Sequence, residues 1–289
     1  MKLFRSRTDD AAATFWDKEI QRRSVYWTEH PLIRSYVNET ITGVSWIWPT
    51  VALKAGWAFK PLGRALSIGC GTGNLERNLR ILNICTTITG LDISKESIKR
   101  ARALAREEKL KGIKYRVADC NRLSLPRARY DGVFFHGSLH HISDPDGLLT
   151  MVHDALLPHG LLYIDDYVGP SRDEWKDEHL QNAREIYEGV PADLRTVPVN
   201  PPLDWNDPSE MIRSSRILPA FFERFEVLHY KPYWGNVLFP LWCALDGEAL
   251  LREEHQSLVQ SFVDAERKLV AANTFEKPLF AVLLGRKKP

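Results

Sequence analysis

A glycine-rich turn within residues 65–77, ALSIGCGTGNLER, constrains the fold of this chain more than any other segment. A short apolar run ends in Gly69, Gly71 and Gly73, and a helical pattern of leucines follows directly. Glycines let the backbone approach a ligand closely, and a helix N-terminus points free N–H groups at it. The segment therefore predicts a strand, a tight turn and a helix. Its spacing is G-x-G-x-G, and dinucleotide-binding turns favour G-x-G-x-x-G.

Glycine turns also join ordinary strands and helices, so the downstream sequence decides what this one does. Strand patterns alternate with helix patterns there, which predicts a doubly wound, mostly parallel α/β sheet. An acid at the end of the second strand is well placed to accept hydrogen bonds from ribose hydroxyls. The segments are TITGLD, which ends in Asp92, IKYRVA, which Asp119 follows, LPRARYDGVFFHGSLHHISD over 125–144, and LLPHGLLYIDDY over 156–167.

The order and spacing of these segments resemble the class I S-adenosylmethionine-dependent methyltransferases. The turn with Asn74 after its last glycine is similar to motif I of that family, and the resemblance covers about residues 60–168. It implies a seven-stranded, Rossmann-like sheet whose last strand is antiparallel to the rest. It also implies S-adenosylmethionine as the cofactor and S-adenosylhomocysteine as the product.

The resemblance further implies a role for each residue of the cofactor site. A carboxylate paired with two hydroxyls is directional, and each buried polar group left unpaired costs about 1–3 kcal/mol. Asp92 could instead cap the next helix, but Ser94 suits that position better. Glu76, in the first turn of its helix, is expected to be a surface acid. The implied contacts are Gly69, Gly71 and Gly73 at the amino-acid end of the cofactor, Asp92 at the ribose hydroxyls, Ile93 on the adenine ring, and Asp119 at the adenine amine with the Cys120 backbone beside it.

Composition divides the chain into three regions. We expect a helical N-terminal extension over 1–60, the cofactor-binding core over 61–168, and a cap insertion that also completes the sheet over 169–289. All nine tryptophans lie outside residues 58–174, so the flanks hold the large aromatic surfaces. Flanks folded over the carboxyl ends of the strands would build the substrate pocket. Alternatively, these aromatics simply fill the core of a helical cap.

The last third of the chain mixes helices, late strands and a long proline-rich loop. The loop, residues 190–208, is interpreted as a lid over the active site, because long loops in compact domains are usually functional or mobile. Arg172, before the loop, could hold an anionic substrate group. Pro219 should end or bend a helix that starts at Ser209. The expected helices span about 172–187, 209–218 and 246–272, and the expected strands span 225–230 and 279–286.

Composition also limits the partners and the compartment. The formal net charge of +2 over 289 residues gives no global electrostatic reason to expect nucleic-acid binding. The four cysteines show no C-x-x-C spacing, and the N-terminus lacks a signal-peptide core, so we expect a reduced, cytoplasmic protein. The most apolar stretch, 41–59, is interrupted by Pro49 and Lys54, which argues against a transmembrane segment.

Candidate catalytic residues gather where the fourth and fifth strands end. Methyl transfer needs chiefly positioning, which can supply roughly 7–11 kcal/mol of the barrier, but a hydroxyl acceptor also needs a base. We expect His136, His141 and Asp166 to fill this role, and one histidine of the pair His140–His141 to be structural. The same group could hold a divalent cation. Because adjacent acids such as Asp165 and Asp166 point to opposite faces of a strand, no metal is expected.

These observations favour a methyltransferase that acts on a small molecule. Oxygen is favoured over nitrogen as the acceptor because acids and histidines line the expected site, and a sugar or secondary-metabolite hydroxyl is the best substrate hypothesis. The alternatives are an N-methyltransferase for a small amine or RNA, and a non-catalytic S-adenosylmethionine-binding protein that acts through partners. The helical pattern at 246–272 has an apolar stripe that could form a homodimer seam.

Overall fold

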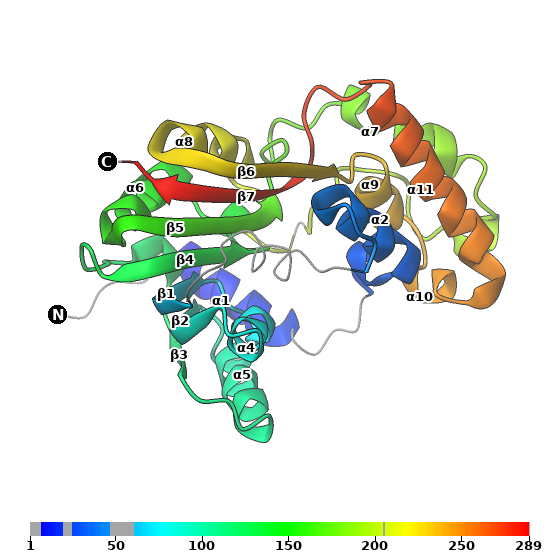
Figure 1. The fold of residues 1–289 in the computed structure, drawn as a ribbon. Coiled ribbons are helices and arrows are strands. Elements are labelled where there is room, and N and C mark those ends of the chain that lie inside the picture. Colours follow the sequence, from blue (N-terminus) through cyan, green and yellow to red (C-terminus); the bar gives the residue numbers. More distant parts are fainter. Residues whose placement is uncertain (1–6, 20–24, 47–60, 205, 289) are drawn as a thin grey trace.

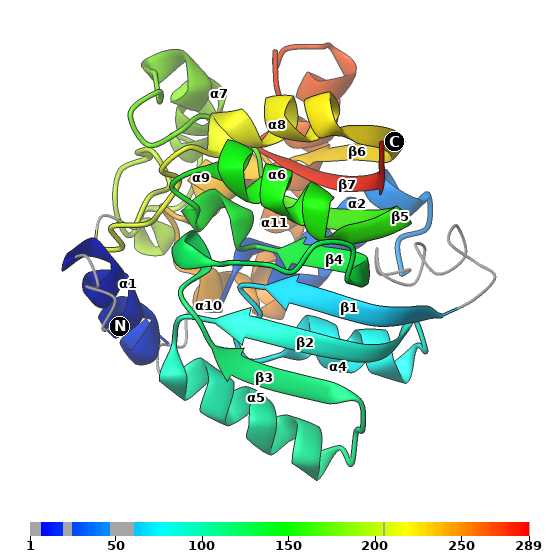
Figure 2. The ribbon, with the colours of Figure 1, turned by 90° about the vertical axis from the view of Figure 1, so that its left-hand side faces the viewer.

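The computed structural model describes residues 7–19, 25–46, 61–204 and 206–288. Seven strands form one sheet in the order β3-β2-β1-β4-β5-β7-β6 (Figures 1 and 2). β7 runs antiparallel to both of its neighbours, and the other paired strands run parallel, which confirms the predicted doubly wound sheet. The strands are β1 (Leu62–Ile68), β2 (Cys85–Asp92), β3 (Ile113–Val117), β4 (Tyr130–His136), β5 (Leu156–Tyr167), β6 (Phe225–Trp234) and β7 (Phe280–Lys287).

Helices cover both faces of the sheet, because the central strands are buried on both sides. In β1, Ala65 packs with the leucines of α4, while the next residue, Leu66, packs on the opposite face with α6 and α8. The helices are α1 (Arg7–Glu19), α2 (Pro31–Thr42), α4 (Asn74–Ile81), α5 (Lys95–Glu107), α6 (Pro145–Ala155), α7 (Asp177–Tyr187), α8 (Ile217–Arg224), α9 (Leu238–Trp242), α10 (Gly247–Leu250) and α11 (Gln256–Ala271).

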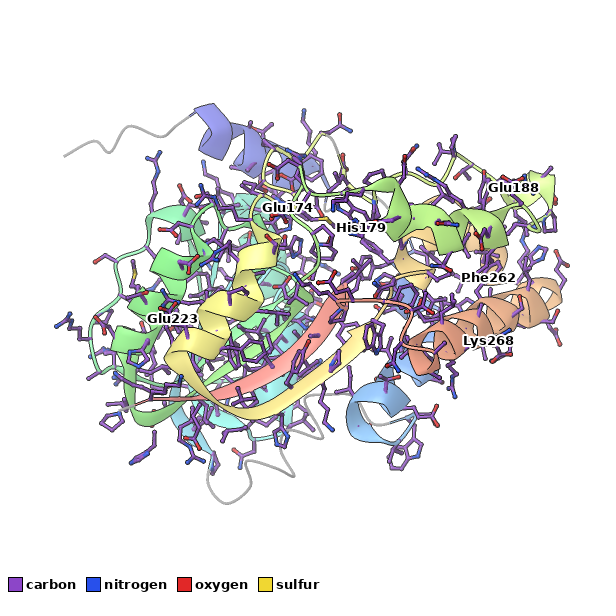
Figure 3. All side chains as sticks on the ribbon, turned by 90° about the horizontal axis from the view of Figure 1, so that it is seen from above. Glu174, His179, Glu188, Glu223, Phe262 and Lys268 are labelled. Atoms are coloured by element: carbon purple, nitrogen blue, oxygen red, sulfur yellow. The ribbon has the colours of Figure 1, made fainter. Side chains whose placement is uncertain are left out.

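A group of helices stands beyond the carboxyl ends of the parallel strands. Helices α2, α7, α9 and α11 lie there together, away from α6 and α8 (Figures 1 and 3). Aromatic rings join this group to the sheet: Trp27 lies 5.0 Å from Phe280 and 6.3 Å from Tyr233, measured between ring centroids. On α11, Phe262 is buried against the body of the protein. The N-terminal aromatic segment and the last third of the chain therefore meet above the sheet edge.

Three local predictions were wrong. Residues from Ser209 form turns, and the helix begins only at Ile217, so that Pro219 lies in the first turn of α8, where a missing N–H costs no helical bond. The predicted helix over 246–272 is interrupted between α10 and α11 by a turn and the 3-10 helix Glu253–His255, and the Leu250 carbonyl accepts from the His30 ring at 3.2 Å instead of from a helical N–H. Glu76 is fully buried.

The proline-rich segment has little regular structure in its described part. It contains a single 3-10 turn, Ala192–Leu194, and one bridge, from Arg195 to Leu245. Arg172 donates to the Asp207 carbonyl at 2.8 Å, so its guanidinium supports this segment from within. No helix among the described residues is long and apolar enough to cross a bilayer, and most of the apolar stretch 41–59 lies outside those residues.

A buried carboxylate fixes the start of α9. Glu266, on α11, is fully buried, and its oxygens accept four consecutive backbone N–H groups, from residues 235–238, at 2.7–3.2 Å. We expect Glu266→Ala to lower the free energy of unfolding by about 2–3 kcal/mol, since it leaves buried donors unpaired. Chemical denaturation would measure this. Glu254→Ala, which removes an exposed ion pair, is the control, and equal stability of the two variants would contradict the prediction.

Candidate active site

A first pocket, the cofactor pocket, opens at the carboxyl ends of β1, β2 and β3. It has a volume of about 220 Å³. Gly69 and Gly71 line it with φ values of +72° and +49°, which favour glycine. A Cβ at Gly69 would lie 2.3 Å from that of Ser138, whereas one at Gly71 would meet nothing within 4 Å. The turn is therefore packed on one side and open on the other.

The predicted cofactor residues converge on this pocket. Asp92, Ile93, Asp119 and Cys120 all line it, although they come from two different strand ends. Gly73, which was also predicted, is not among the residues that line the pocket. It has a φ of +78° and is the N-cap residue of α4, and its carbonyl accepts from the Tyr115 hydroxyl.

Asp92 also holds the glycine turn in place. Its Oδ2 accepts from the Gly71 N–H at 2.7 Å, and its Oδ1 accepts from the Ser94 N–H at 2.8 Å. Ser94 itself caps α5 through the Ser97 N–H, as predicted. Each carboxylate oxygen can accept a further hydrogen bond, so Asp92 keeps acceptor capacity for a ligand in the pocket.

Helix α1 forms one wall of the cofactor pocket, a contact that sequence reasoning missed. Asp17 accepts from the Ser94 hydroxyl at 2.6 Å and from the Glu96 N–H at 3.1 Å, which ties α1 to the start of α5. Ala12 and Trp16 on the same helix line the pocket. Only the helical pattern of this segment was readable from the sequence, because nothing local indicates which surface it covers.

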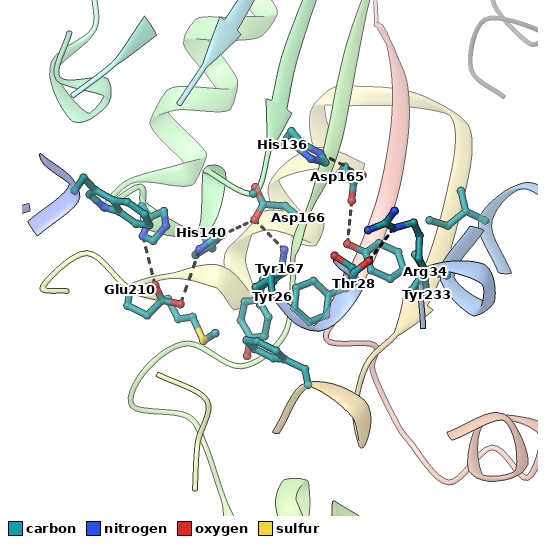
Figure 4. Close-up of a pocket in the computed structure, with 18 residues that line it drawn as sticks. Tyr26, Thr28, Arg34, His136, His140, Asp165, Asp166, Tyr167, Glu210 and Tyr233 are labelled. Atoms are coloured by element: carbon teal, nitrogen blue, oxygen red, sulfur yellow. Dashed lines mark hydrogen bonds and ion pairs between the residues drawn. The ribbon is translucent and has the colours of Figure 1, made fainter. Parts of the chain in front are cut away.

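A second pocket, the acceptor pocket, adjoins the first and has a volume of about 370 Å³. The two pockets share four lining residues: Trp16, His136, Gly137 and His141. Aromatic rings from distant parts of the chain form much of the wall around the polar groups of β4 and β5 (Figure 4). These rings are Trp16, Tyr26, Tyr167, Tyr233, Phe239 and Phe280.

His140 and Asp166 form the closest acid–histidine pair of the acceptor pocket. His140 Nδ1 lies 2.5 Å from Asp166 Oδ1 (Figure 4). The other carboxylate oxygen accepts from the N–H groups of Ser138 and Leu139. Burial lowers the pKa of His140, but the charge and hydrogen bond of Asp166 outweigh it and raise the pKa to about 9. Because Nδ1 faces Asp166, Nε2 is the ring atom that could meet a ligand, and in the structure it lies 3.9 Å from Glu210 Oε1 (Figure 4).

His136 belongs to a separate network on the other face of β5. Its Nδ1 lies 3.3 Å from Asp165, which also accepts from the Tyr233 hydroxyl at 2.9 Å (Figure 4). Asp165 accepts from the Tyr163 hydroxyl as well, at 3.1 Å. Burial opposes the charged imidazole, but the hydrogen bond to Asp165 more than compensates and raises the pKa of His136. As predicted, adjacent Asp165 and Asp166 serve opposite faces of the strand.

His141 faces acids that come from the segment before α8. Its Nδ1 lies 3.4 Å from Asp207 and 3.7 Å from Glu210. Burial and the neighbouring His140 lower the pKa of His141 well below its usual value. Among the described residues, His140, His141 and Glu210 each offer one ligand atom within 4.8 Å of the others, so this trio could hold a divalent metal ion. It differs from the cluster of His136, His141 and the two β5 acids considered from the sequence.

The structure thus brings together all three candidate catalytic residues, but on two faces of the sheet edge. His136 and His141 lie at the junction of the pockets, and Asp166 lies in the acceptor pocket with His140. Glu210 was missed because no pattern around it marks a site; only the three-dimensional fold brings it to the histidines.

The sheet order, the open glycine turn and the carboxylates at successive strand ends together define a class I S-adenosylmethionine-dependent methyltransferase. A family model described as a methyltransferase domain matches residues 60–216, more than half of the chain, and the chain belongs to this family. S-adenosylmethionine is accordingly its cofactor.

Curated relatives include enzymes for both oxygen and nitrogen acceptors. The 27-O-demethylrifamycin SV methyltransferase of Amycolatopsis mediterranei is 28% identical over 45% of this chain and 47% of its own length. Phosphoethanolamine N-methyltransferase 2 of Caenorhabditis elegans is 29% identical over 43% of this chain and 29% of its own length. The chain therefore matches about half or less of the length of these relatives.

Solved structures share the fold over nearly the whole chain. The cyclase SpnF aligns over 97% of this chain and 96% of its own, with a TM-score of 0.55 and 18% identity. Phosphoethanolamine N-methyltransferase 2 of Haemonchus contortus, in complex with S-adenosyl-L-methionine, aligns over 95% of this chain and 60% of its own, with a TM-score of 0.55 and 16% identity. At such identities the likeness shows the fold alone.

Proposed function

We propose that this protein is a small-molecule O-methyltransferase. The observation that carries the proposal is the meeting of two pockets: the cofactor pocket and the acceptor pocket share His136, Gly137, His141 and Trp16. A methyl donor in one and an acceptor in the other would face each other at this junction. The relative that O-methylates a rifamycin supports a secondary-metabolite or sugar hydroxyl as the acceptor.

In the proposed mechanism, S-adenosylmethionine supplies an activated methyl group, and the protein positions the acceptor and accepts its proton. His140 Nε2 takes the hydroxyl proton, while Asp166 orients the ring and stabilises its charged form through Nδ1. A positive charge in the adjoining pocket would oppose the raised pKa of His140, since nearby cations favour the neutral imidazole. Trp16, which lines both pockets, excludes water from the junction. His136, on the other face, orients the acceptor.

The lining of the acceptor pocket favours a neutral acceptor. Among the described residues that line this pocket, the acids are Asp165, Asp166 and Glu210, and the one arginine is Arg34. The Arg34 guanidinium donates to two backbone carbonyls, those of Thr28 and Glu29, at 3.2 and 2.9 Å. A phosphorylated acceptor would meet three carboxylates, which repel it, and an arginine that already donates to backbone carbonyls. Hydroxyls of a sugar or a flat aromatic metabolite match both the polar groups and the rings.

Two alternatives remain distinct from this proposal. Acids in the pocket would also suit a small amine, and the phosphoethanolamine N-methyltransferases show that relatives act on nitrogen. A binding protein without turnover would keep the cofactor pocket, and the likeness to a cyclase means that the fold alone does not fix the reaction. A methyl-transfer assay with matched hydroxyl and amine acceptors, read by S-adenosylhomocysteine release, separates the three. Release with amines only, or with no acceptor, would overturn O-methylation.

Dependence on a metal is a separate prediction. His140, His141 and Glu210 would hold such an ion, which would lower the pKa of the acceptor hydroxyl. In the proposed mechanism His140 is the base, so we expect less than about a twofold loss of kcat after exhaustive treatment with a chelator. If the chelator abolishes turnover and Mg²⁺, Zn²⁺ or Mn²⁺ restores it, a bound metal ion, and not the His140 base, activates the acceptor hydroxyl.

A further inference from the structure

Glu210 is an acid of the acceptor pocket that the proposed mechanism leaves without a role. It lies in the turns before α8, and its carboxylate faces His140 (Figure 4). One carboxylate oxygen lies 3.9 Å from His140 Nε2 and the other 3.7 Å from His141 Nδ1, both too far for a hydrogen bond. Among the residues that the structure describes, none donates a hydrogen bond to this side chain. The carboxylate therefore keeps its acceptor capacity for a ligand.

The segment that carries Glu210 is held from behind, so the carboxylate is a fixed part of the pocket wall. The fully buried Asp207 side chain accepts from the Ser209 N–H at 2.8 Å and from the Ser209 hydroxyl at 2.6 Å. Arg172 donates from its guanidinium to the Asp207 carbonyl and from its backbone N–H to the Met211 carbonyl, both at 2.8 Å. These bonds fix the backbone on both sides of Glu210, which lowers the entropy cost when its side chain binds a ligand.

The described wall around Glu210 offers hydrogen-bond acceptors to a ligand. Two tyrosines that line the pocket, Tyr167 and Tyr233, donate their hydroxyl protons to other protein groups, each at 2.9 Å. In the proposed mechanism, His140 Nε2 accepts the proton of the hydroxyl that is methylated. That hydroxyl has only one proton, so it cannot also donate to Glu210. The carboxylate therefore calls for a second donor on the acceptor molecule.

We propose that the acceptor is a vicinal diol, and that Glu210 accepts a hydrogen bond from the hydroxyl next to the one that is methylated. The inference rests on the proposed O-methylation with His140 as the base. Because His140 Nε2 and Glu210 Oε1 face each other across 3.9 Å, the two acceptor atoms converge on one small space. Hydroxyls on adjacent carbons bring two protons into that space. One proton passes to Nε2, and the other stays in the bond to Glu210.

The test compares acceptors that differ in the neighbouring hydroxyl. Release of S-adenosylhomocysteine would be measured with catechol, resorcinol and phenol, and with cis-cyclohexane-1,2-diol and cyclohexanol. We expect kcat/KM for the two vicinal diols to exceed that for phenol and cyclohexanol by about 10- to 100-fold, as for a hydrogen bond to a charged group. Resorcinol has two hydroxyls that are not adjacent, so it should behave like phenol.

Two conditions make this comparison specific for Glu210. The assays contain a chelator, because a diol could also bind a metal ion held by His140, His141 and Glu210. They are run at about pH 8, because burial raises the pKa of the Glu210 carboxyl to about 7 and the hydrogen bond requires the ionised form.

Variants of Glu210 separate recognition of the diol from an effect on the base. Glu210→Ala should reduce the preference for diols to about twofold or less, whereas Glu210→Gln, whose amide oxygen still accepts, should keep part of it. If Glu210 acted only through the charge of His140, kcat/KM would change equally for all acceptors and the preference would stay. Asp204→Asn is the matched control, since it removes a nearby acid of the same segment that does not line the pocket, and it should keep the wild-type preference.

The results that would overturn the inference differ in what they leave standing. Equal kcat/KM for diols and monohydroxy compounds, or an undiminished preference in Glu210→Ala, would remove the diol and leave O-methylation in place. Faster O-methylation of cis-2-aminocyclohexanol than of the diol would assign Glu210 to an ammonium group instead. Release of S-adenosylhomocysteine with amines only, or with none of these acceptors, would overturn the diol and the proposed O-methylation together.

Discussion

His140→Ala is expected to lower kcat by about 100- to 10,000-fold, the usual contribution of a positioned general base. His140 lines the acceptor pocket and not the cofactor pocket, so the affinity for S-adenosylhomocysteine should change by less than about twofold. Asp166→Asn should reduce kcat as well, because the amide cannot stabilise the charged ring. Single-turnover kinetics with a confirmed acceptor, together with calorimetry, would measure both quantities.

Two other histidine variants serve as comparisons for the loss of kcat in His140→Ala. His153→Ala removes a histidine that contacts the Lys288 carbonyl at 3.2 Å, outside both pockets, and should leave kcat unchanged. His136→Ala should have the smaller effect of the two pocket variants, since His136 orients the acceptor from the other face. A larger loss in His136→Ala than in His140→Ala would assign the base to the Asp165 network.

The cofactor half of the site was predictable from the sequence because each residue lies at the end of its own strand. The family resemblance assigned Gly69, Asp92 and Asp119 to the cofactor, and the rule that parallel strands present their carboxyl ends at one edge explains why all three line one pocket. One contact of Asp92 was not predicted: its carboxylate also accepts from the Gly71 N–H.

The acceptor half could not be predicted in the same way, because its walls come from segments distant in sequence. Trp16, Tyr233 and Glu210 reach the pocket from α1, from the end of β6 and from the turns before α8. No local periodicity encodes such contacts, since each depends on how an entire flank packs over the sheet.

The choice between adjacent histidines was also beyond the sequence. His140 and His141 occupy one 3-10 turn, Leu139–His141, so a difference of one position decides which ring meets Asp166. The sequence analysis named His136, His141 and Asp166 as candidates, and the structure places His140, the neighbour of His141, 2.5 Å from Asp166. Side-chain geometry was therefore needed to propose His140 as the base that deprotonates the acceptor. Its partner, Asp166, was already a candidate from the sequence.

The second large effect concerns Asp92→Ala, which should weaken S-adenosylhomocysteine binding by about 10- to 100-fold. The substitution strands the Gly71 and Ser94 N–H groups and, with ligand bound, two ribose hydroxyls, and each unpaired buried group costs about 1–3 kcal/mol. The Gly71 and Ser94 N–H groups are also unpaired in the variant without ligand. The loss of binding free energy is therefore smaller than the sum of the four individual costs.

Asp131→Ala is the matched control for that measurement. Asp131 also accepts a backbone N–H, that of Arg64, at 2.7 Å, but near the start of β1 and away from both pockets. Calorimetric titration should show wild-type affinity for Asp131→Ala and weakened affinity for Asp92→Ala, with both proteins folded. Equal affinities would mean that the ribose binds elsewhere and that Asp92 only closes the glycine turn. A loss restricted to Asp92→Ala would link the turn, the strand end and the cofactor in one site.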